Sequence, residues 1–303
     1  MPEGGVARWL AMPDGARLRV FTWEGGSRGT VFFFGGRTEF VEKYFEVVGE
    51  LRARGFAVVS LDWRGQGLST RMLADPRKGH IDDFSTFDRD LAHVMAEIAP
   101  GFPKPWFALA HSMGGTVLLK AAHDHPDWFA GVVLSAPMLG LKFSGKAMAR
   151  TVRGIATGLG SIGFGKRYLP GGTRKAADEN PFEHNILTHD ERRYATLQAL
   201  IRAKPALGLG SATVGWLHAA FRAIDAMSAP GWLAKVRTPV LICAAERDSL
   251  IDGAALRHAA SHLPAGELVE IAEARHEILI ERDPCRAAFW DAFDRFIGEL
   301  EKN

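Results

Sequence analysis

Short apolar runs alternate with longer amphipathic stretches along most of the chain. The apolar runs are rich in β-branched and aromatic residues, and several are apolar throughout, which is typical of strands covered on both faces. The stretches between them repeat apolar positions at helical spacing. We expect strands at residues 18–23, 30–34, 57–61, 106–110, 131–135, 239–245 and 267–271, and helices at 39–54, 84–98, 116–125 and about 286–300. This alternation predicts an α/β fold with a mainly parallel central sheet and helices on both faces.

The alternation stops after the strand expected at 131–135. From about residue 139 to residue 233 the sequence is helical or loop-like, with glycine clusters, and strand character resumes near Val236. A helical insertion between two strands of one sheet is typical of a lid. We therefore predict an α/β core formed by residues 1–138 and 234–303, and a helical cap formed by residues 139–233.

Composition narrows the class of protein. The chain has 303 residues, of which 47% are hydrophobic and 24% charged, as expected of a globular protein. A net charge of +2 gives no reason to expect a nucleic-acid partner. No stretch approaches the roughly 18 apolar residues that cross a bilayer, and the N-terminus lacks an apolar signal core. We expect a cytoplasmic protein, and the sequence leaves its oligomeric state open.

One serine lies between an expected strand and the helix that opens at about Met113. The local sequence Ala-His-Ser-Met-Gly, at residues 110–114, resembles the G-x-S-x-G turn that exposes a nucleophilic serine between a strand and a helix. Ala110 replaces the first glycine but is still small enough for a sharp turn. The alternative is that Ser112 only caps a helix, as serines often do. The strand before it and the helix after it favour a nucleophile.

The residues that would activate such a serine follow in the expected chain order. Asp248 comes just after the strand expected at 239–245, and His276 lies on the loop after the last expected strand. Both therefore belong to the edge of the sheet that carries Ser112. A neutral imidazole at His276 would take the serine proton, and Asp248 would orient it. Glu246 and Asp252 are rival candidates for the acid.

An oxyanion hole needs two N–H donors near the nucleophile. The backbone N–H of Met113, directly after Ser112, is the first candidate. The second is the backbone N–H of Arg37, in the loop after the strand expected at 30–34, where Gly35 and Gly36 would let the backbone approach a substrate. A plain glycine turn is the alternative interpretation of that loop.

With these residues assembled, the chain resembles the lysophospholipase and monoacylglycerol-lipase branch of the α/β-hydrolases, and the bacterial lysophospholipase L2 type most of all. The similarity runs from about residue 17 to residue 296, and is carried by residues 36–39 with Lys43 and Tyr44, and by residues 62–69, 110–115, 204–216 and 275–281. The resemblance implies an α/β-hydrolase fold. It also implies a triad of Ser112, Asp248 and His276, with oxyanion donors at Arg37 and Met113. The chain departs from the family at Ala110, and at Gly35, where relatives often carry histidine or proline.

The first part of the expected cap is strongly basic. It holds no Asp or Glu between residues 142 and 175, and its basic residues are Lys142, Lys146, Arg150, Arg153, Lys166, Arg167, Arg174 and Lys175. Apolar residues are interleaved with them. Such a surface could rest on an anionic membrane or meet a phosphate head group. A solvated helix face is the alternative.

These observations predict a serine ester hydrolase that acts on single-chain lipids, either lysophospholipid or monoacylglycerol. A general carboxylesterase or an amide-cleaving peptidase on the same triad is the alternative, since a fold does not fix a substrate. A catalytically silent binding protein is a further alternative. We expect no cofactor and no metal, because His258 and His262 have the spacing of a metal pair but lack the glutamate of an H-E-x-x-H motif.

Overall fold

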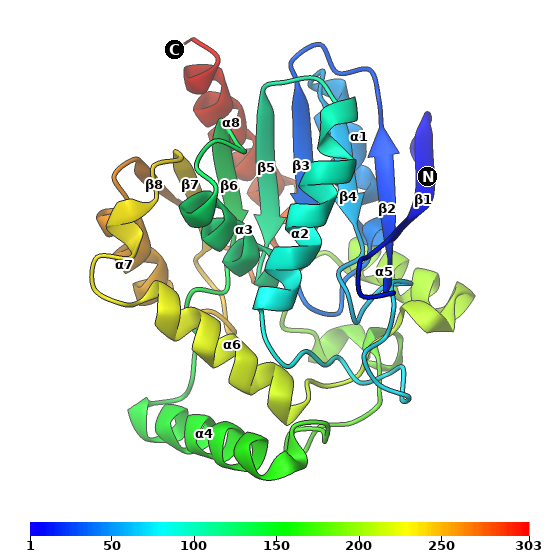
Figure 1. The fold of residues 1–303 in the computed structure, drawn as a ribbon, viewed down its shortest axis with the longest axis vertical. Helices are drawn as coiled ribbons and strands as arrows, with labels where there is room; N and C mark the ends of the chain where they lie inside the picture. Colours follow the sequence, from blue (N-terminus) through cyan, green and yellow to red (C-terminus); the bar gives the residue numbers. More distant parts are fainter. Residues whose placement is uncertain (303) are drawn as a thin grey trace.

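An eight-stranded sheet forms the centre of the computed structural model, which describes residues 1–302 (Figure 1). The strand order across the sheet is β1-β2-β4-β3-β5-β6-β7-β8. β1 and β2, and β2 and β4, pair antiparallel, whereas every other neighbouring pair is parallel. The strands are β1 (Gly5–Ala11), β2 (Arg17–Trp23), β3 (Thr30–Phe34), β4 (Ala57–Leu61), β5 (Trp106–His111), β6 (Gly131–Ser135), β7 (Val240–Ala245) and β8 (Gly266–Ile271). The predicted mainly parallel sheet is confirmed.

Helices cover both faces of this sheet. The α-helices of the described residues are α1 (Phe45–Ala53), α2 (Ser85–Glu97), α3 (Met113–Asp124), α4 (Lys146–Leu159), α5 (Glu191–Ala203), α6 (Val214–Met227), α7 (Gly253–His262) and α8 (Asp283–Leu300). Successive side chains of a strand point to opposite faces. Phe32 and Phe34 accordingly pack with α2, α3 and α7, whereas Val31 and Phe33 pack with α1 and α8. The two resulting cores explain why these strands are apolar throughout.

The parallel register aligns the carboxyl ends of the strands that matter for chemistry. Phe34 at the end of β3 lies beside Ala110 on β5, and Ala245 at the end of β7 lies beside Ile271 on β8. The loops that follow these four strands therefore leave the sheet along one edge, as is general for ligand sites in such sheets.

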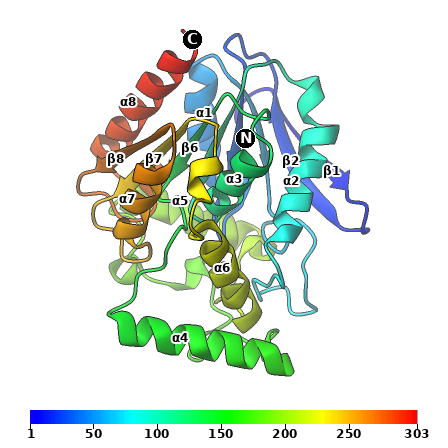
Figure 2. The same ribbon diagram turned by 60° about the vertical axis from the view of Figure 1, so that its left-hand side comes forward.

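Residues 139–233, which we call the inserted segment, lie between β6 and β7 and contain α4, α5 and α6. In both views α6 lies between the sheet and α4, and α4 is at the outer end of the molecule (Figures 1 and 2). Within the described residues the segment holds no strand. It has one isolated β-bridge of its own, Tyr168–Thr213, and two to the rest of the chain, Leu141–Ile251 and Gly79–Ala212.

Short helices complete the fold. They are the 3-10 helices η1 (Val41–Tyr44), η2 (Ala99–Gly101), η4 (Ala177–Glu179), η5 (Phe182–His184), η6 (Pro205–Leu207), η7 (Leu233–Lys235) and η8 (Ile278–Ile280), and the π-helix η3 (Gly160–Phe164). η1 and α1 together replace the single helix expected at 39–54. The helical stretch begins only at Val41 because Phe40 is extended, and Tyr44, with φ −108° and ψ 18°, separates η1 from α1. No helix among residues 1–302 is both long enough and apolar enough to pass through a bilayer.

Candidate active site

Ser112 lies at the junction of β5 and α3, in a backbone conformation that residues other than glycine rarely adopt. Its φ is 51° and its ψ is −117°. The turn is held by two backbone hydrogen bonds, from the Ser112 N–H to the Ser135 carbonyl at 3.0 Å and from the Met138 N–H to the Ser112 carbonyl at 3.0 Å. Small residues are required next to it, since a Cβ on Gly114 would lie 2.5 Å from the Gly35 carbonyl oxygen. This strained turn presents the hydroxyl at the edge of the sheet.

The structure brings the three predicted triad residues together. The Ser112 hydroxyl lies 3.0 Å from Nε2 of His276, and Nδ1 of His276 lies 2.7 Å from Oδ2 of Asp248. Both His276 and Asp248 are buried. Because Nδ1–H donates to the carboxylate, Nε2 is left as the acceptor for the serine proton.

Asp248 is fixed as an ionised acceptor. Its Oδ1 accepts hydrogen bonds from the backbone N–H groups of Leu250 at 2.8 Å and Ile251 at 3.0 Å. Burial alone would raise the pKa of Asp248, but the His276 ring and these N–H groups outweigh burial and lower it below its usual value. The carboxylate is therefore charged at neutral pH and has both oxygens occupied.

The rival acids have other partners. Asp252 caps α7, where its Oδ1 accepts the Ala254 N–H at 3.0 Å. Glu246 accepts the backbone N–H of Glu273 at 2.7 Å, at the protein surface. Neither carboxylate forms a hydrogen bond or an ion pair with His276 in the part of the chain that the structure describes.

The two predicted oxyanion donors lie on the same cavity as Ser112. The first N–H groups of a helix have no partner within it, so the Met113 N–H at the start of α3 is available. The Gly36 N–H, by contrast, donates to the Glu39 carboxylate. A Cβ on Gly36 would lie 2.9 Å from Cβ of Ser112, so the loop passes close to the serine. The next backbone N–H along this loop is that of Arg37.

This cavity has a volume of about 490 Å³ and lies between the sheet edge and the inserted segment. Its polar lining includes Ser112, His276 and Arg37. The rest of the wall is predominantly apolar and includes Met138, Leu141, Phe143, Val152, Leu169, Leu187, Trp216, Leu217, Leu250 and Ile251. Such a lining suits an aliphatic chain next to the reactive hydroxyl.

The comparison with known families decides the class of protein. Residues 25–283 match the family model described as "Serine aminopeptidase, S33", which is far more than half of the chain. The chain belongs to this family of α/β-hydrolases. The family resemblance and the fold predicted from the sequence are both confirmed, and the protein is a serine hydrolase.

This S33 hydrolase is similar to known proteins over most of its length. "Lysophospholipase L2" of Escherichia coli K12 is 34% identical over 276 residues, which cover 86% of this chain and 78% of that protein. "Probable lysophospholipase L2" of Haemophilus influenzae is 28% identical over 278 residues, covering 91% and 85%. A solved structure, a soluble variant of monoglyceride lipase from Saccharomyces cerevisiae in complex with a substrate analog, superposes with a TM-score of 0.75 at 20% identity, covering 98% and 96%. This last likeness concerns the fold alone.

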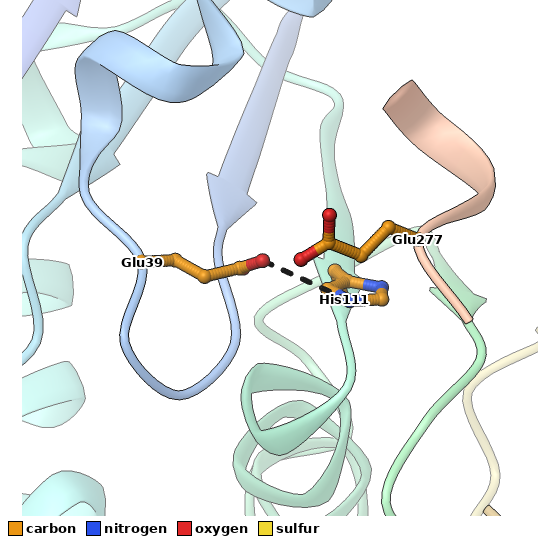
Figure 3. Close-up of side chains that lie close together, drawn as sticks. All are labelled: Glu39, His111 and Glu277. Carbon is orange, nitrogen blue, oxygen red and sulfur yellow. Dashed lines mark ion pairs between the residues drawn. The ribbon is translucent and has the colours of Figure 1, made fainter. Parts of the chain in front are cut away.

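A buried charge network lies directly beside the triad of this S33 hydrolase, and sequence reasoning did not predict it. Lys43 Nζ lies 2.6 Å from a carboxylate oxygen of Glu39 and 2.6 Å from one of Glu277. His111, the residue before the serine, has its ring centroid 4.7 Å from that of His276, and its Nε2 lies 3.8 Å from Glu39. Figure 3 shows Glu39, His111 and Glu277 converging from three separate segments.

The network has the properties of a salt-bridge cluster. Glu39, His111 and Glu277 present possible ligand atoms within 4.8 Å of one another, but Lys43 already provides a cation to both carboxylates. Burial would raise the pKa of Glu39, yet Lys43 and His111 lower it to about 2. Burial dominates for Glu277, whose pKa is raised. The network as a whole joins the loop that carries Arg37 to the loop that carries His276.

The two histidines with the spacing of a metal pair lie away from the triad. His258 and His262 are both on α7, with ring centroids 4.0 Å apart, and Nδ1 of His262 lies 2.8 Å from the His258 carbonyl oxygen. This is a contact along one helix face, as expected for their spacing.

Proposed function

We propose that this protein is an ester hydrolase of single-chain lipids, lysophospholipid or monoacylglycerol, that works through an acyl-enzyme on Ser112. The observation that carries the proposal is the pair of hydrogen bonds from Ser112 to His276 and from His276 to Asp248, at 3.0 and 2.7 Å, facing an apolar cavity. Two relatives that the comparisons name, those of Escherichia coli and Haemophilus influenzae, are described as lysophospholipase L2 and probable lysophospholipase L2.

In the proposed mechanism, Ser112 Oγ attacks the ester carbonyl while Nε2 of His276 takes its proton. Asp248 stabilises the imidazolium that forms. The backbone N–H groups of Arg37 and Met113 would stabilise the negative oxygen of the tetrahedral intermediate, where one donor typically contributes about 3–4 kcal/mol. His276 then protonates the leaving alcohol. Water attacks the acyl-enzyme by the same route and releases the fatty acid.

The inserted segment would act as a cap over this site. Val152, Leu169, Trp216 and Leu217 come from it and line the cavity, so a lipid chain would lie between the segment and the sheet edge. The predicted division of the chain at 138/139 and 233/234 is part of this proposal.

An amide-cleaving activity, which the printed family description suggests, has less support at this site. An aminopeptidase needs a carboxylate that is free to bind the substrate ammonium group. The acids on the cavity wall next to Ser112, Glu39 and Glu277, already share the Lys43 ammonium, and the one Glu277 oxygen without a partner is buried. A general carboxylesterase would use the same triad. Comparing kcat/KM on short-chain esters with kcat/KM on single-chain lipids separates it from a lipase.

We also propose a peripheral contact between α4 and an anionic membrane. Met148, Ile155 and Ile162 repeat every seven residues along α4 and η3 and are 50%, 40% and 67% exposed. Basic residues such as Lys146 and Arg150 lie on the same exposed helix. Exposed apolar side chains flanked by cations are typical of helices that lie in a membrane interface.

The test is a substrate panel on purified protein, with lysophospholipid, monoacylglycerol, short-chain ester and aminoacyl amide. We expect the highest kcat/KM on a single-chain lipid. Short-chain esters that exceed every lipid would contradict the lipid assignment. Ser112→Ala should abolish both turnover and labelling by a fluorophosphonate probe, whereas Ser261→Ala, on the exposed surface of α7, should keep both.

A further inference from the structure

The Arg37 side chain is a cation on the wall of the reactive cavity that has no anionic partner. Among residues 1–302, its guanidinium forms no ion pair with a carboxylate. Nη2 donates to the Gly210 carbonyl at 2.9 Å, and the guanidinium carbon lies 5.2 Å from the centre of the Trp216 ring. Nε is buried and has no hydrogen-bond partner. One donor of the guanidinium is therefore left unused inside the protein.

The fully buried arginines in the described part of the chain are neutralised. Arg19 pairs with Asp62 and Glu42, Arg64 with Asp90 and Asp14, and Arg193 with Glu46, Asp190 and Asp283. This is the general rule, because a buried charge without a partner is costly. Arg37 is half-buried and, like the half-buried Arg71, forms no ion pair among residues 1–302, but of these two only Arg37 lines the cavity that holds Ser112.

The guanidinium remains charged where it lies. Burial lowers the pKa of Arg37 to about 10, which still leaves it protonated at neutral pH. The guanidinium fits only because residue 79 is glycine, since a Cβ on Gly79 would lie 2.8 Å from Nη2 of Arg37. Gly79 and Trp216 thus flank the planar group, and such a planar fork suits two-point recognition of phosphate.

We infer that the Arg37 guanidinium binds the phosphate of a lysophospholipid head group while the acyl chain occupies the apolar wall of the same cavity. This inference rests on the proposed function and refines it, because it makes the phosphate-bearing lipid the preferred substrate over the neutral monoacylglycerol. The bound phosphate would supply the anion that Arg37 lacks in the protein itself. It would also orient the ester toward Ser112.

A purely structural role is the competing explanation. Through Gly210 and Trp216, Arg37 joins the loop after β3 to the inserted segment. Loss of such a tether would impair every substrate alike, and so would a disturbance of the oxyanion donor on the Arg37 backbone. The ratio between two substrates with the same acyl chain removes both effects.

The experiment measures kcat/KM for a lysophospholipid and for the monoacylglycerol of the same acyl chain, both below their micellar concentrations. In Arg37→Gln the ratio of the two values should fall by about 10–100-fold, as expected for loss of a charge-assisted hydrogen-bond pair. Arg37→Lys, which keeps the charge without the fork, should lie between. Arg89→Gln, an exposed arginine on α2, is the control and should leave the ratio unchanged. A ratio in Arg37→Gln within about twofold of the wild type would overturn the inference.

A binding measurement separates this inference from the proposed function. Ser112→Ala is titrated with an ether-linked lysophospholipid, which cannot be hydrolysed, and with glycerol 3-phosphate. We expect the ether lipid to bind at least about tenfold more tightly than glycerol 3-phosphate, and to lose that affinity when Arg37→Gln is added. Failure of the wild type to hydrolyse either lipid would refute the proposed function while this result still supports the phosphate site. Ether-lipid binding that does not change with Arg37→Gln would refute the phosphate site, and equal binding of glycerol 3-phosphate would refute the placement of the acyl chain on the apolar wall.

Discussion

Asp248 illustrates how the reactive groups are held at the scale of single residues. One oxygen faces His276, and the other accepts two backbone N–H groups of the loop that follows β7. The carboxylate therefore cannot turn away from the imidazole without breaking backbone contacts. Asp252, only four residues further on, is tied to the start of α7 instead.

Exchange of these two acids for asparagine gives a direct test of the assignment. Asp248→Asn should lower kcat by roughly 10³–10⁴-fold, because an amide cannot hold His276 in the tautomer that accepts the serine proton. Asp252→Asn should retain activity and stability, since asparagine caps helices as well as aspartate does. Steady-state kinetics and thermal unfolding of both variants decide the matter. An active Asp248→Asn together with an inactive Asp252→Asn would transfer the role to Asp252.

The paired histidines make a prediction about pH. Burial lowers the pKa of His111 to about 3, and its Nδ1–H donates to the Ser135 carbonyl at 3.1 Å, so His111 stays neutral through the working range. His111 therefore adds no protonation step of its own to the acid side of the activity profile. A plot of log kcat/KM against pH should fall on its acid side with a slope of about 1. A slope of about 2 that becomes 1 in His111→Asn would show that His111 takes up a proton in this range after all.

At the scale of single residues, the sequence was enough to predict the triad, because its members follow the chain order Ser, Asp, His. The serine turn and the positions of Asp248 and His276 after strands were enough to expect them at one edge, and the structure brings them within hydrogen-bond distance. Their catalytic roles stay predictions. The Glu39, Lys43 and Glu277 cluster was missed because Glu277 lies 234 residues from Lys43 in the chain. The spacing of Glu39 and Lys43, four residues apart, was the available signal.

At the scale of elements, Lys43 joins η1 to the loop before η8. Its ammonium is buried between one carboxylate from each side, at 2.6 Å from both. Removal of a buried cation leaves two like charges facing each other without compensation, which is more harmful than the loss of a surface pair.

Lys43→Met should therefore destabilise the fold by about 3–5 kcal/mol, measured as the free energy of unfolding in urea. The matched control is Lys120→Met, which breaks partly exposed pairs with Asp88 and Asp124 and should lose less than about 1 kcal/mol. A loss in Lys43→Met no larger than in the control would mean that the cluster contributes little to stability.

Strands buried on both faces were predicted best. β3, β4 and β6 have the expected bounds, because their apolar runs end where burial ends. β1 was not predicted. It lies at the sheet edge with most of its residues exposed, so its sequence carries no apolar alternation and only its pairing with β2 defines it.

At the scale of the whole molecule, α4 is the outermost helix of the inserted segment (Figures 1 and 2). Its inner face packs on α6, where Ala156 is fully buried. Its outer side carries Met148 and Ile155, in a region rich in lysine and arginine. The proposed membrane contact belongs to this surface.

Sedimentation with lipid vesicles tests that contact. The protein should bind vesicles that contain anionic lipid, and less so as salt screens the charges. Replacing Ile155 and Ile162 by serine should weaken binding by roughly tenfold or more, because each exposed side chain loses its burial in the interface. Val6→Ser, which alters an exposed apolar residue on β1, is the control and should bind as the wild type does. Equal binding by all three proteins would argue against α4 as the contact.

The two strands that flank the inserted segment are parallel neighbours in the sheet. Val132 on β6 is paired with Val240 on β7, so the chain departs from one strand and returns on its hydrogen-bonded neighbour. β6 and β7 pair directly, so no residue of the inserted segment is needed to hold them together. A different insertion of similar span could consequently be grafted between the same two strands, leaving the reacting atoms in place while altering which molecules reach them. Diversification of such enzymes would then proceed by exchange of one module, with the chemistry inherited unchanged.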